Sequence, residues 1–314
     1  MKVIEHISKA SAPLISFEIV PPMRGGSIQD ITNIVKAIQP YNPSWIDVTA
    51  HSANAIYSER PDGTIDRKIF RKRPGTLGIC GIIQNRFKID TVAHILCEGF
   101  TKEETEDAMI ELNFLGVNNV LALKGDSLNF KKTISKEKHQ NHFASELVAQ
   151  ICDMKKGLFL SEIENAHSLD FGVGVAGYPE KHFEAPNLKT DILYLKQKID
   201  RGAEYVVTQM FFDNKKYFDF VTDCKNAGIS CPIIPGIKII KSVRQLTSLP
   251  RDFHINMPNE FVDEVMSNPE HVREIGIRWA IKQSEELLNN NVPSLHFYIM
   301  NESDCVLEVL KKVR

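Results

Sequence analysis

The sequence predicts an α/β protein in which eight β/α units close into a TIM barrel. Short β-rich runs alternate with helical patterns along the chain, and no low-complexity stretch divides it. Several runs are apolar on both faces, which is typical of parallel strands covered by helices. A chain of 314 residues is longer than a usual domain, but α/β barrels of this length fold as one domain. We therefore expect a single barrel domain over residues 1–314, ending in a short C-terminal helix.

The expected strands are runs rich in β-branched and aromatic residues, bounded by turn-forming residues. Their lengths suit strands rather than helices. In chain order they lie at 14–20, 45–50, 91–97, 119–123, 171–176, 205–210, 232–236 and 294–300.

Amphipathic patterns fill the gaps between these runs. Isoleucines recur on one helical face of residues 27–39. Thr101 and Glu104 form a capping box ahead of a helix at 102–115. Residues 76–87 suit either a strand or a helix, and the regular alternation favours a helix. Further helices are expected at 190–201, 214–227 and 269–290.

A doubly wound sheet is the alternative fold. Gly172-x-Gly174-x-x-Gly177 matches the dinucleotide-binding fingerprint, which requires a strand, the glycines and then a helix. Here the glycines lie within the expected strand, and Tyr178-Pro179 follows them. The pattern instead favours small residues that let a ligand or another backbone approach closely.

Composition favours a cytoplasmic protein. The formal net charge of −2 gives no electrostatic reason to expect nucleic acid or an anionic membrane as a partner. The basic residues at 67–73 are interpreted as a solvated loop, because no basic helix face extends them. The six cysteines form no Cys-x-x-Cys pair, which favours reduced thiols. The first ten residues lack the apolar core of a signal peptide, and no run is long enough to span a membrane.

Two acids stand where apolar strands end. Glu18 lies in SFEIVPP and Asp126 in VLALKGDS. A carboxylate beside a buried strand is costly unless it is paired or used, and the carboxyl ends of barrel strands carry the active site. Two structural interpretations stay open: an interior ion pair for Glu18, and an N-cap or turn role for Asp126.

Other polar side chains also mark strand ends. His94 could be a hydrogen-bonded core histidine, and Gln209 could satisfy backbone groups. The chain has no His-x-x-x-His, P-loop or Gly-x-Ser-x-Gly pattern, so zinc chemistry, phosphoryl transfer and serine hydrolysis are not favoured, and no metal site is expected. The full set at the strand ends is Glu18, Thr49, His94, Asp126, Tyr178, Gln209 and Pro235.

Six motifs resemble one known family. SFEIVPP, VLALKGD, VAGYPExH, KxKxDxGAEYVVTQMFFD, CPIIPGI and LHFY match the 5,10-methylenetetrahydrofolate reductases in order and spacing, from about residue 14 to residue 301. The chain resembles the short bacterial form. The resemblance implies a homo-oligomeric TIM-barrel flavoprotein that binds FAD non-covalently. It also implies reduction of 5,10-methylenetetrahydrofolate to 5-methyltetrahydrofolate by a ping-pong scheme, with NADH or NADPH as electron donor.

The resemblance also implies roles for individual residues. Glu18 matches the general acid that opens the imidazolidine ring, and Asp126 matches the acid that stabilises the resulting 5-iminium cation and tunes the flavin. Gln209 matches the residue that binds the pterin, and Gln245 and Leu249 fall where relatives contact substrate or nicotinamide. The positions that match FAD contacts are Thr49, His94, Lys124, Gly125, Asp126, Phe143, Ala144, Tyr178, His182, Asp191 and Lys198.

Some residues depart from the family pattern. Lys124 replaces the commoner Arg, and the two are not equivalent where a planar contact matters. Leu249 replaces an aromatic residue that stacks on the ligand in some relatives, so the choice between NADH and NADPH stays open. Ala50-His51, Met210 and Glu302 also differ. Three other functions remain as alternatives: a flavin-free relative with direct hydride transfer, a FAD- or folate-binding subunit of a larger electron-transfer complex, and a folate-binding methyltransferase barrel.

Overall fold

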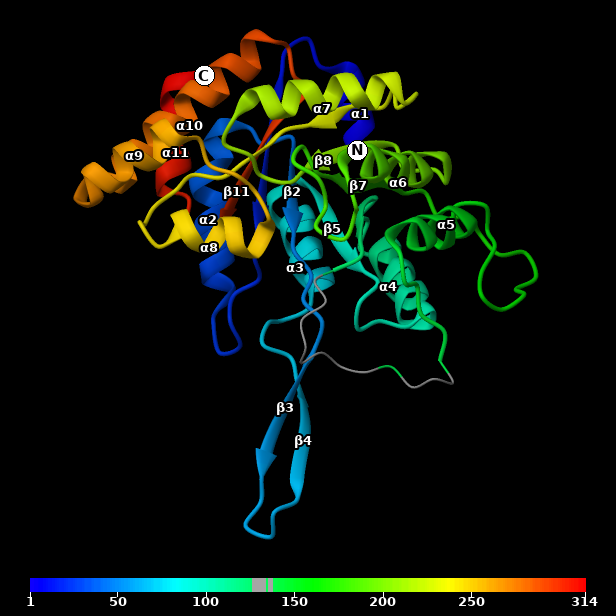
Figure 1. Cartoon of the computed structure of the whole chain (residues 1–314). Helices are drawn as coiled ribbons and strands as arrows, with labels where there is room; N and C mark the ends of the chain where they lie inside the picture. Colours follow the sequence, from blue (N-terminus) through cyan, green and yellow to red (C-terminus); the bar gives the residue numbers. More distant parts are fainter. Residues whose placement is uncertain (126–133, 135–137) are drawn as a thin grey trace.

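The computed structural model describes residues 1–125, 134 and 138–314, and it shows a barrel of parallel strands surrounded by helices (Figure 1). The strands pair in the order β10-β11-β1-β2-β5-β6-β7-β8-β9, so the TIM barrel predicted from the sequence is confirmed. The strands are β1 Leu14–Ile19, β2 Trp45–Val48, β5 Asp90–Leu96, β6 Asn119–Leu123, β7 Gly172–Gly177, β8 Tyr205–Thr208, β9 Ile233–Ile234, β10 Gly236–Ile237 and β11 Ser294–Met300.

Strands β9 and β10 share one position of the barrel, on either side of Pro235. Strand β9 pairs with β8, and β10 pairs with β11. Proline has no N–H to donate to a neighbouring strand, which explains the break. The Pro235 carbonyl still accepts a hydrogen bond from His296 N (3.0 Å). The nine strands therefore fill the eight positions that the sequence predicts.

Helices cover the outside of the barrel (Figure 1). Each of the six predicted helical segments contains a helix, and residues 76–87 form α3 followed by a π-helical turn. The Thr101–Glu104 capping box is present, with both reciprocal hydrogen bonds formed. The C-terminal helix is α11, whereas α1, α5, α8 and α9 were not predicted. The helices are α1 Val3–Lys9, α2 Ile28–Ile38, α3 Thr76–Ile82, α4 Lys102–Phe114, α5 Ala144–Met154, α6 Leu188–Asp200, α7 Asn214–Asn226, α8 Gln245–Phe253, α9 Asn259–Ser267, α10 Val272–Asn289 and α11 Asp304–Val313.

The two faces of each strand bury different side chains. Along β1, Phe17 and Ile19 point outward into the main core beneath the helices. Ser16 and Glu18 alternate with them and point into the barrel, because successive side chains of a strand face opposite sides. The barrel interior therefore contains polar side chains from β1 as well as a small apolar layer that includes Trp45 and Leu121. Within the described ranges, no helix is both long and apolar enough to cross a membrane.

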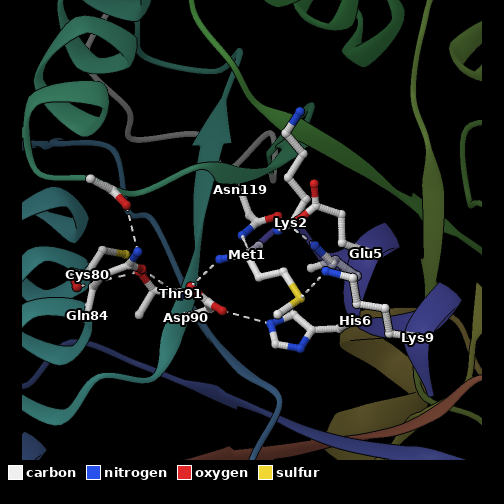
Figure 2. Close-up of polar contacts among 12 residues, drawn as sticks. Met1, Lys2, Glu5, His6, Lys9, Cys80, Gln84, Asp90, Thr91 and Asn119 are labelled. Carbon is white, nitrogen blue, oxygen red and sulfur yellow. Dashed lines mark hydrogen bonds and ion pairs between the residues drawn. The ribbon is translucent and has the colours of Figure 1, made fainter. Parts of the chain in front are cut away.

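Helix α1 closes the amino-terminal end of the barrel. Val3 is fully buried against an apolar layer that includes Trp45. Figure 2 shows the polar contacts around this helix. The Asn119 side chain accepts a hydrogen bond from Val3 N (2.8 Å). His6 Nε2 lies 2.7 Å from Asp90 Oδ2 (Figure 2). Ligands must therefore reach the barrel from its carboxyl end.

A two-stranded antiparallel ribbon projects from the barrel after β2 (Figure 1). It consists of β3 (Asn54–Glu59) and β4 (Ile65–Phe70). The interpretation of 67–73 as a loop was wrong in part: Arg67 and Lys68 are exposed, as expected, but they belong to β4. The turn sequence Pro61-Asp62-Gly63 between alternating residues is a hairpin signal that could have revealed the ribbon.

The glycines of the dinucleotide-like pattern lie within β7, and α6 begins only at Leu188. A Cβ atom at Gly174 would lie 2.3 Å from the ring of Tyr205, and one at Gly177 would lie 2.7 Å from Val206 Cγ1. The small residues therefore allow close packing with neighbouring side chains. The doubly wound alternative is wrong, because the strands close into a barrel.

Replacing Gly174 with alanine should destabilise the fold by about 1–3 kcal/mol, the usual cost of overpacking a core. Tyr205 is fully buried and cannot move aside freely. The free energy of unfolding in urea measures the effect. Gly78→Ala is the matched control, because a Cβ there meets nothing within 4 Å and the residue lies in a helix. Equal stabilities of the two variants would contradict the packing argument.

Candidate active site

A cavity of about 1380 Å³ opens at the carboxyl ends of the barrel strands. Sites for a single small ligand usually measure about 300–1,000 Å³, so this cavity has room for a larger ligand or for two. Asp126 lies outside the described residues. Of the residues predicted at the strand ends, Pro235 does not line the cavity. The other predicted catalytic, substrate-binding and cofactor-binding residues all line it: Glu18, Thr49, His94, Lys124, Gly125, Phe143, Ala144, Tyr178, His182, Asp191, Lys198, Gln209, Gln245 and Leu249.

Glu18 lies near the end of β1, and the residue as a whole is only 9% exposed. Burial raises the pKa of its carboxyl to about 7, because a charged carboxylate loses hydration there. His94 and Lys238 oppose this shift, whereas the negative charge of Asp47 adds to it. A carboxyl with this pKa holds its proton on about half of the molecules at neutral pH, as a general acid requires.

His94 projects from β5 and lies between two carboxylates. Its Nε2 is 3.4 Å from Asp47 Oδ2 and 3.6 Å from Glu18 Oε2. Burial alone would lower the pKa of His94, but the hydrogen bond to Asp47 and the charges of both acids outweigh it and raise the pKa. Glu18 therefore lies beside an ion-pair partner, and His94 is a buried, hydrogen-bonded histidine, as the two structural interpretations stated. Both side chains also line the cavity.

Asp47 was not predicted as a site residue. Its side chain is 1% exposed, and it lies opposite Glu18 in the pairing of β1 with β2. The signal was an acid inside the apolar strand sequence WIDV. Lys238 was also missed: its Nζ donates to the Tyr298 carbonyl (2.9 Å), and burial lowers its pKa to about 8. Both Lys238 and Tyr298 line the cavity.

A second part of the cavity carries a buried amine. Lys198 Nζ, from α6, donates to the Ala176 carbonyl (2.7 Å). Burial lowers the pKa of Lys198 to about 8, and the nearby Asp191 carboxylate opposes the shift. Asp191 accepts a hydrogen bond from His182 N (2.8 Å). The protonated amine of Lys198 is a compact positive charge, so it can bind an anionic group of a ligand.

Aromatic side chains line the mouth near this amine. The rings of Tyr178 and His182 meet edge to face at 4.6 Å. Phe143 is 59% exposed, and Lys124 Nζ lies 5.7 Å from the centre of its ring. Lys124 also pairs with Glu184, at 2.6 and 2.7 Å. An exposed ring beside a cation, such as Phe143 beside Lys124, suits a ligand that combines an aromatic system with anionic groups.

The predicted substrate-binding residues have contacts within the protein as well. Gln209 Oε1 accepts a hydrogen bond from Met210 N (2.9 Å). Gln245 Oε1 accepts from Lys241 N (2.6 Å), next to the start of α8. Leu249 is 8% exposed and belongs to a small apolar cluster. In the described part of the chain, no group of three His, Cys, Asp or Glu side chains could hold a metal ion.

Comparisons with known proteins give one family. Residues 2–314 match the family model described as methylenetetrahydrofolate reductase. The "Probable methylenetetrahydrofolate reductase (NADH)" of Oryza sativa subsp. japonica is 28% identical over 325 residues, covering 99% of this chain and 50% of the relative. The "5,10-methylenetetrahydrofolate reductase" of Buchnera aphidicola is 29% identical over 297 residues, covering 94% of this chain and 89% of the relative. The chain thus spans about half the length of the plant relative.

Solved structures share the fold at low sequence identity. A Clostridium thermocellum protein described as binding "two copies of 5-methyl-5,6,7,8-tetrahydrofolic acid" superposes with a TM-score of 0.62 and 13% identity, covering 98% of this chain and 96% of that one. An oxaloacetate acetylhydrolase has a TM-score of 0.50 and 10% identity, covering 94% of this chain and 78% of that one. At these identities the likeness concerns the barrel alone.

Proposed function

Because the chain belongs to the methylenetetrahydrofolate reductase family, we propose that it reduces 5,10-methylenetetrahydrofolate to 5-methyltetrahydrofolate, with FAD as cofactor and NADH or NADPH as electron donor. The observation that carries this proposal is Glu18, an almost buried acid on the cavity wall whose pKa is raised to about 7. Opening the folate ring needs an acid that still holds its proton near neutrality.

Glu18 would act at the first chemical step. Its proton passes to N10 of the folate as the bond between N10 and the bridging carbon breaks, and the electron pair of that bond stays on N10. The bridging carbon becomes a 5-iminium cation. The carboxylate left on Glu18 lies 3.6 Å from His94 Nε2, and a charged imidazole there stabilises it.

The lining of the cavity fits FAD. Its volume exceeds that of a single small-ligand site, Lys198 can pair with a phosphate, and the rings of Tyr178 and Phe143 offer contacts for an aromatic system. When bound, FAD supplies the transfer of electrons between nicotinamide and folate. Thr49, His94, Gly125 and Ala144 complete the proposed cofactor contacts, and Gln209 offers an amide that can both donate to and accept from a pterin edge.

The absorbance spectrum of the purified protein tests the proposal. We expect flavin bands as purified or after FAD is added, and oxidation of NADH or NADPH that depends on methylenetetrahydrofolate. A protein that takes up no flavin would exclude the mechanism, and nicotinamide oxidation without flavin would instead favour direct hydride transfer. Flavin without nicotinamide oxidation would favour an electron-transfer subunit. Folate binding with neither activity would favour a methyltransferase barrel.

Replacing Asp126 with asparagine should slow folate reduction about tenfold, or roughly 1.4 kcal/mol, and leave FAD bound. The proposed reason is the loss of a negative charge that stabilises the 5-iminium cation. Rates of folate reduction at saturating substrate, together with the flavin content of the variant, measure the effect. Unchanged folate kinetics would contradict this role for Asp126.

A further inference from the structure

Inside the barrel, a single nitrogen of His94 lies between two carboxylates. Glu18, Asp47 and His94 project inward from the adjacent strands β1, β2 and β5. His94 Nε2 carries at most one hydrogen, and it lies 3.4 Å from Asp47 and 3.6 Å from Glu18. The two acids therefore compete for the same positive charge.

Of the two acids, Asp47 is the one that pairs with the positive charge of His94. Its side chain is 1% exposed, whereas that of Glu18 is 12% exposed and faces the cavity. Among the described residues, His94 is the hydrogen-bond donor to Asp47, and Asp47 Oδ1 accepts no hydrogen bond from the protein. An ionised carboxylate so deeply buried is stable only beside a cation. Because the charge of His94 pairs with Asp47, Glu18 is the acid that can keep its proton.

The other groups around Glu18 do not replace this pairing. His296 Nδ1 lies 3.9 Å from Asp47 Oδ1 and 2.9 Å from Ser16 Oγ, but burial lowers the pKa of His296 and favours its neutral form. Burial raises the pKa of Tyr205 and of Tyr298, so both phenols stay neutral. In the described part of the chain, Lys238 is the other cation that acts on Glu18, and it favours the ionised form of Glu18.

We propose that Asp47 is a positioning residue of the reaction, which holds the His94 imidazolium on its own side and so keeps Glu18 in the acid form. The inference rests on the proposed role of Glu18 as general acid. Asp47 itself does not line the cavity.

Asp47→Asn tests the inference, because asparagine keeps the shape of the side chain and removes its charge. The negative charge of Asp47 opposes ionisation of Glu18, so without that charge Glu18 should lose its proton at lower pH. We expect the alkaline limb of the pH profile of folate reduction to move down by about one pH unit. That shift means about tenfold less activity above the limb, with little change well below it. Stopped-flow rates between pH 5.5 and 9 measure both features.

Two further variants separate electrostatics from packing. Ser16→Ala removes a buried hydrogen bond from the same strand and face without changing any charge, and it should leave the limb in place. His94→Gln removes the cation beside Glu18, so the limb should move upward, opposite to the shift in Asp47→Asn. This variant keeps the inference testable if Asp47→Asn does not fold.

Several outcomes would overturn the inference. They are a uniform loss of rate in Asp47→Asn without a moved limb, an equal shift in Ser16→Ala, or an unmoved limb in His94→Gln. The unmodified protein serves as the separate test of the proposed function: if it shows no folate reduction, or no alkaline limb, then the role of Glu18 fails first. A limb near pH 7 in the unmodified protein that Asp47→Asn leaves unmoved rejects only the role of Asp47.

Discussion

Replacing Glu18 with glutamine should slow reduction of methylenetetrahydrofolate by roughly 10²- to 10⁴-fold, the usual contribution of a general acid. Glutamine keeps nearly the same shape but has no proton of suitable pKa to give to N10. FAD binding should survive, because the side chain changes little in size. Reduction of the flavin by NADH or NADPH should also survive, since that half of the reaction needs no proton from Glu18.

Anaerobic stopped-flow absorbance separates the two halves. We expect the flavin of Glu18→Gln to bleach normally with nicotinamide and to recover its colour very slowly when the folate is added. Glu285→Gln, at an exposed position of α10, is the matched control and should behave as the unmodified protein. Normal recovery of colour in Glu18→Gln would rule out Glu18 as the acid.

The pH dependence of the same half-reaction follows from the raised pKa of Glu18. The carboxyl is protonated below about pH 7 and ionised above it. The rate of folate reduction should therefore be level at low pH and fall about tenfold per unit well above pH 7. The Glu18→Gln variant should lose this limb along with its activity.

The fold was predictable where burial leaves a pattern in the sequence. Parallel strands covered on both faces are continuously apolar, so all eight strand positions were found. The ribbon of β3 and β4 was missed because it buries little and its strands carry charges, although its Pro61-Asp62-Gly63 turn is visible. Helix α1 was missed because seven residues with one buried side chain give almost no periodicity.

The site was predictable where topology alone brings residues together. A barrel gathers the carboxyl ends of its strands on one face, so strand-end residues such as Glu18, His94 and Gln209 were found to share a cavity. Asp47 and Lys238 were missed for a physical reason. Asp47 lies within β2 and Lys238 directly follows β10. Whether such residues face inward, and which neighbours they meet, depends on strand register, and a single sequence does not reveal register.

Replacing Lys198 with methionine should weaken FAD binding by roughly 1.5–3 kcal/mol, or about 10- to 150-fold in Kd. Methionine keeps the length of the apolar stem and removes the charge that we propose pairs with a cofactor phosphate. Because burial lowers the pKa of this amine to about 8, the unmodified protein should bind FAD less tightly as the pH rises through 8. Only the protonated amine attracts the phosphate, so the variant should lose this pH dependence.

Titration of the flavin-free protein with FAD, followed by quenching of flavin fluorescence between pH 6.5 and 9.5, measures both effects without any turnover. Lys196→Met is the matched control, because this lysine lies on the same helix but pairs with Asp200 away from the cavity. An affinity that Lys198→Met leaves unchanged would mean that the phosphates lie elsewhere in the cavity. A weaker affinity that keeps its pH dependence would assign the titrating group to another residue, and Lys198 would then act only through packing.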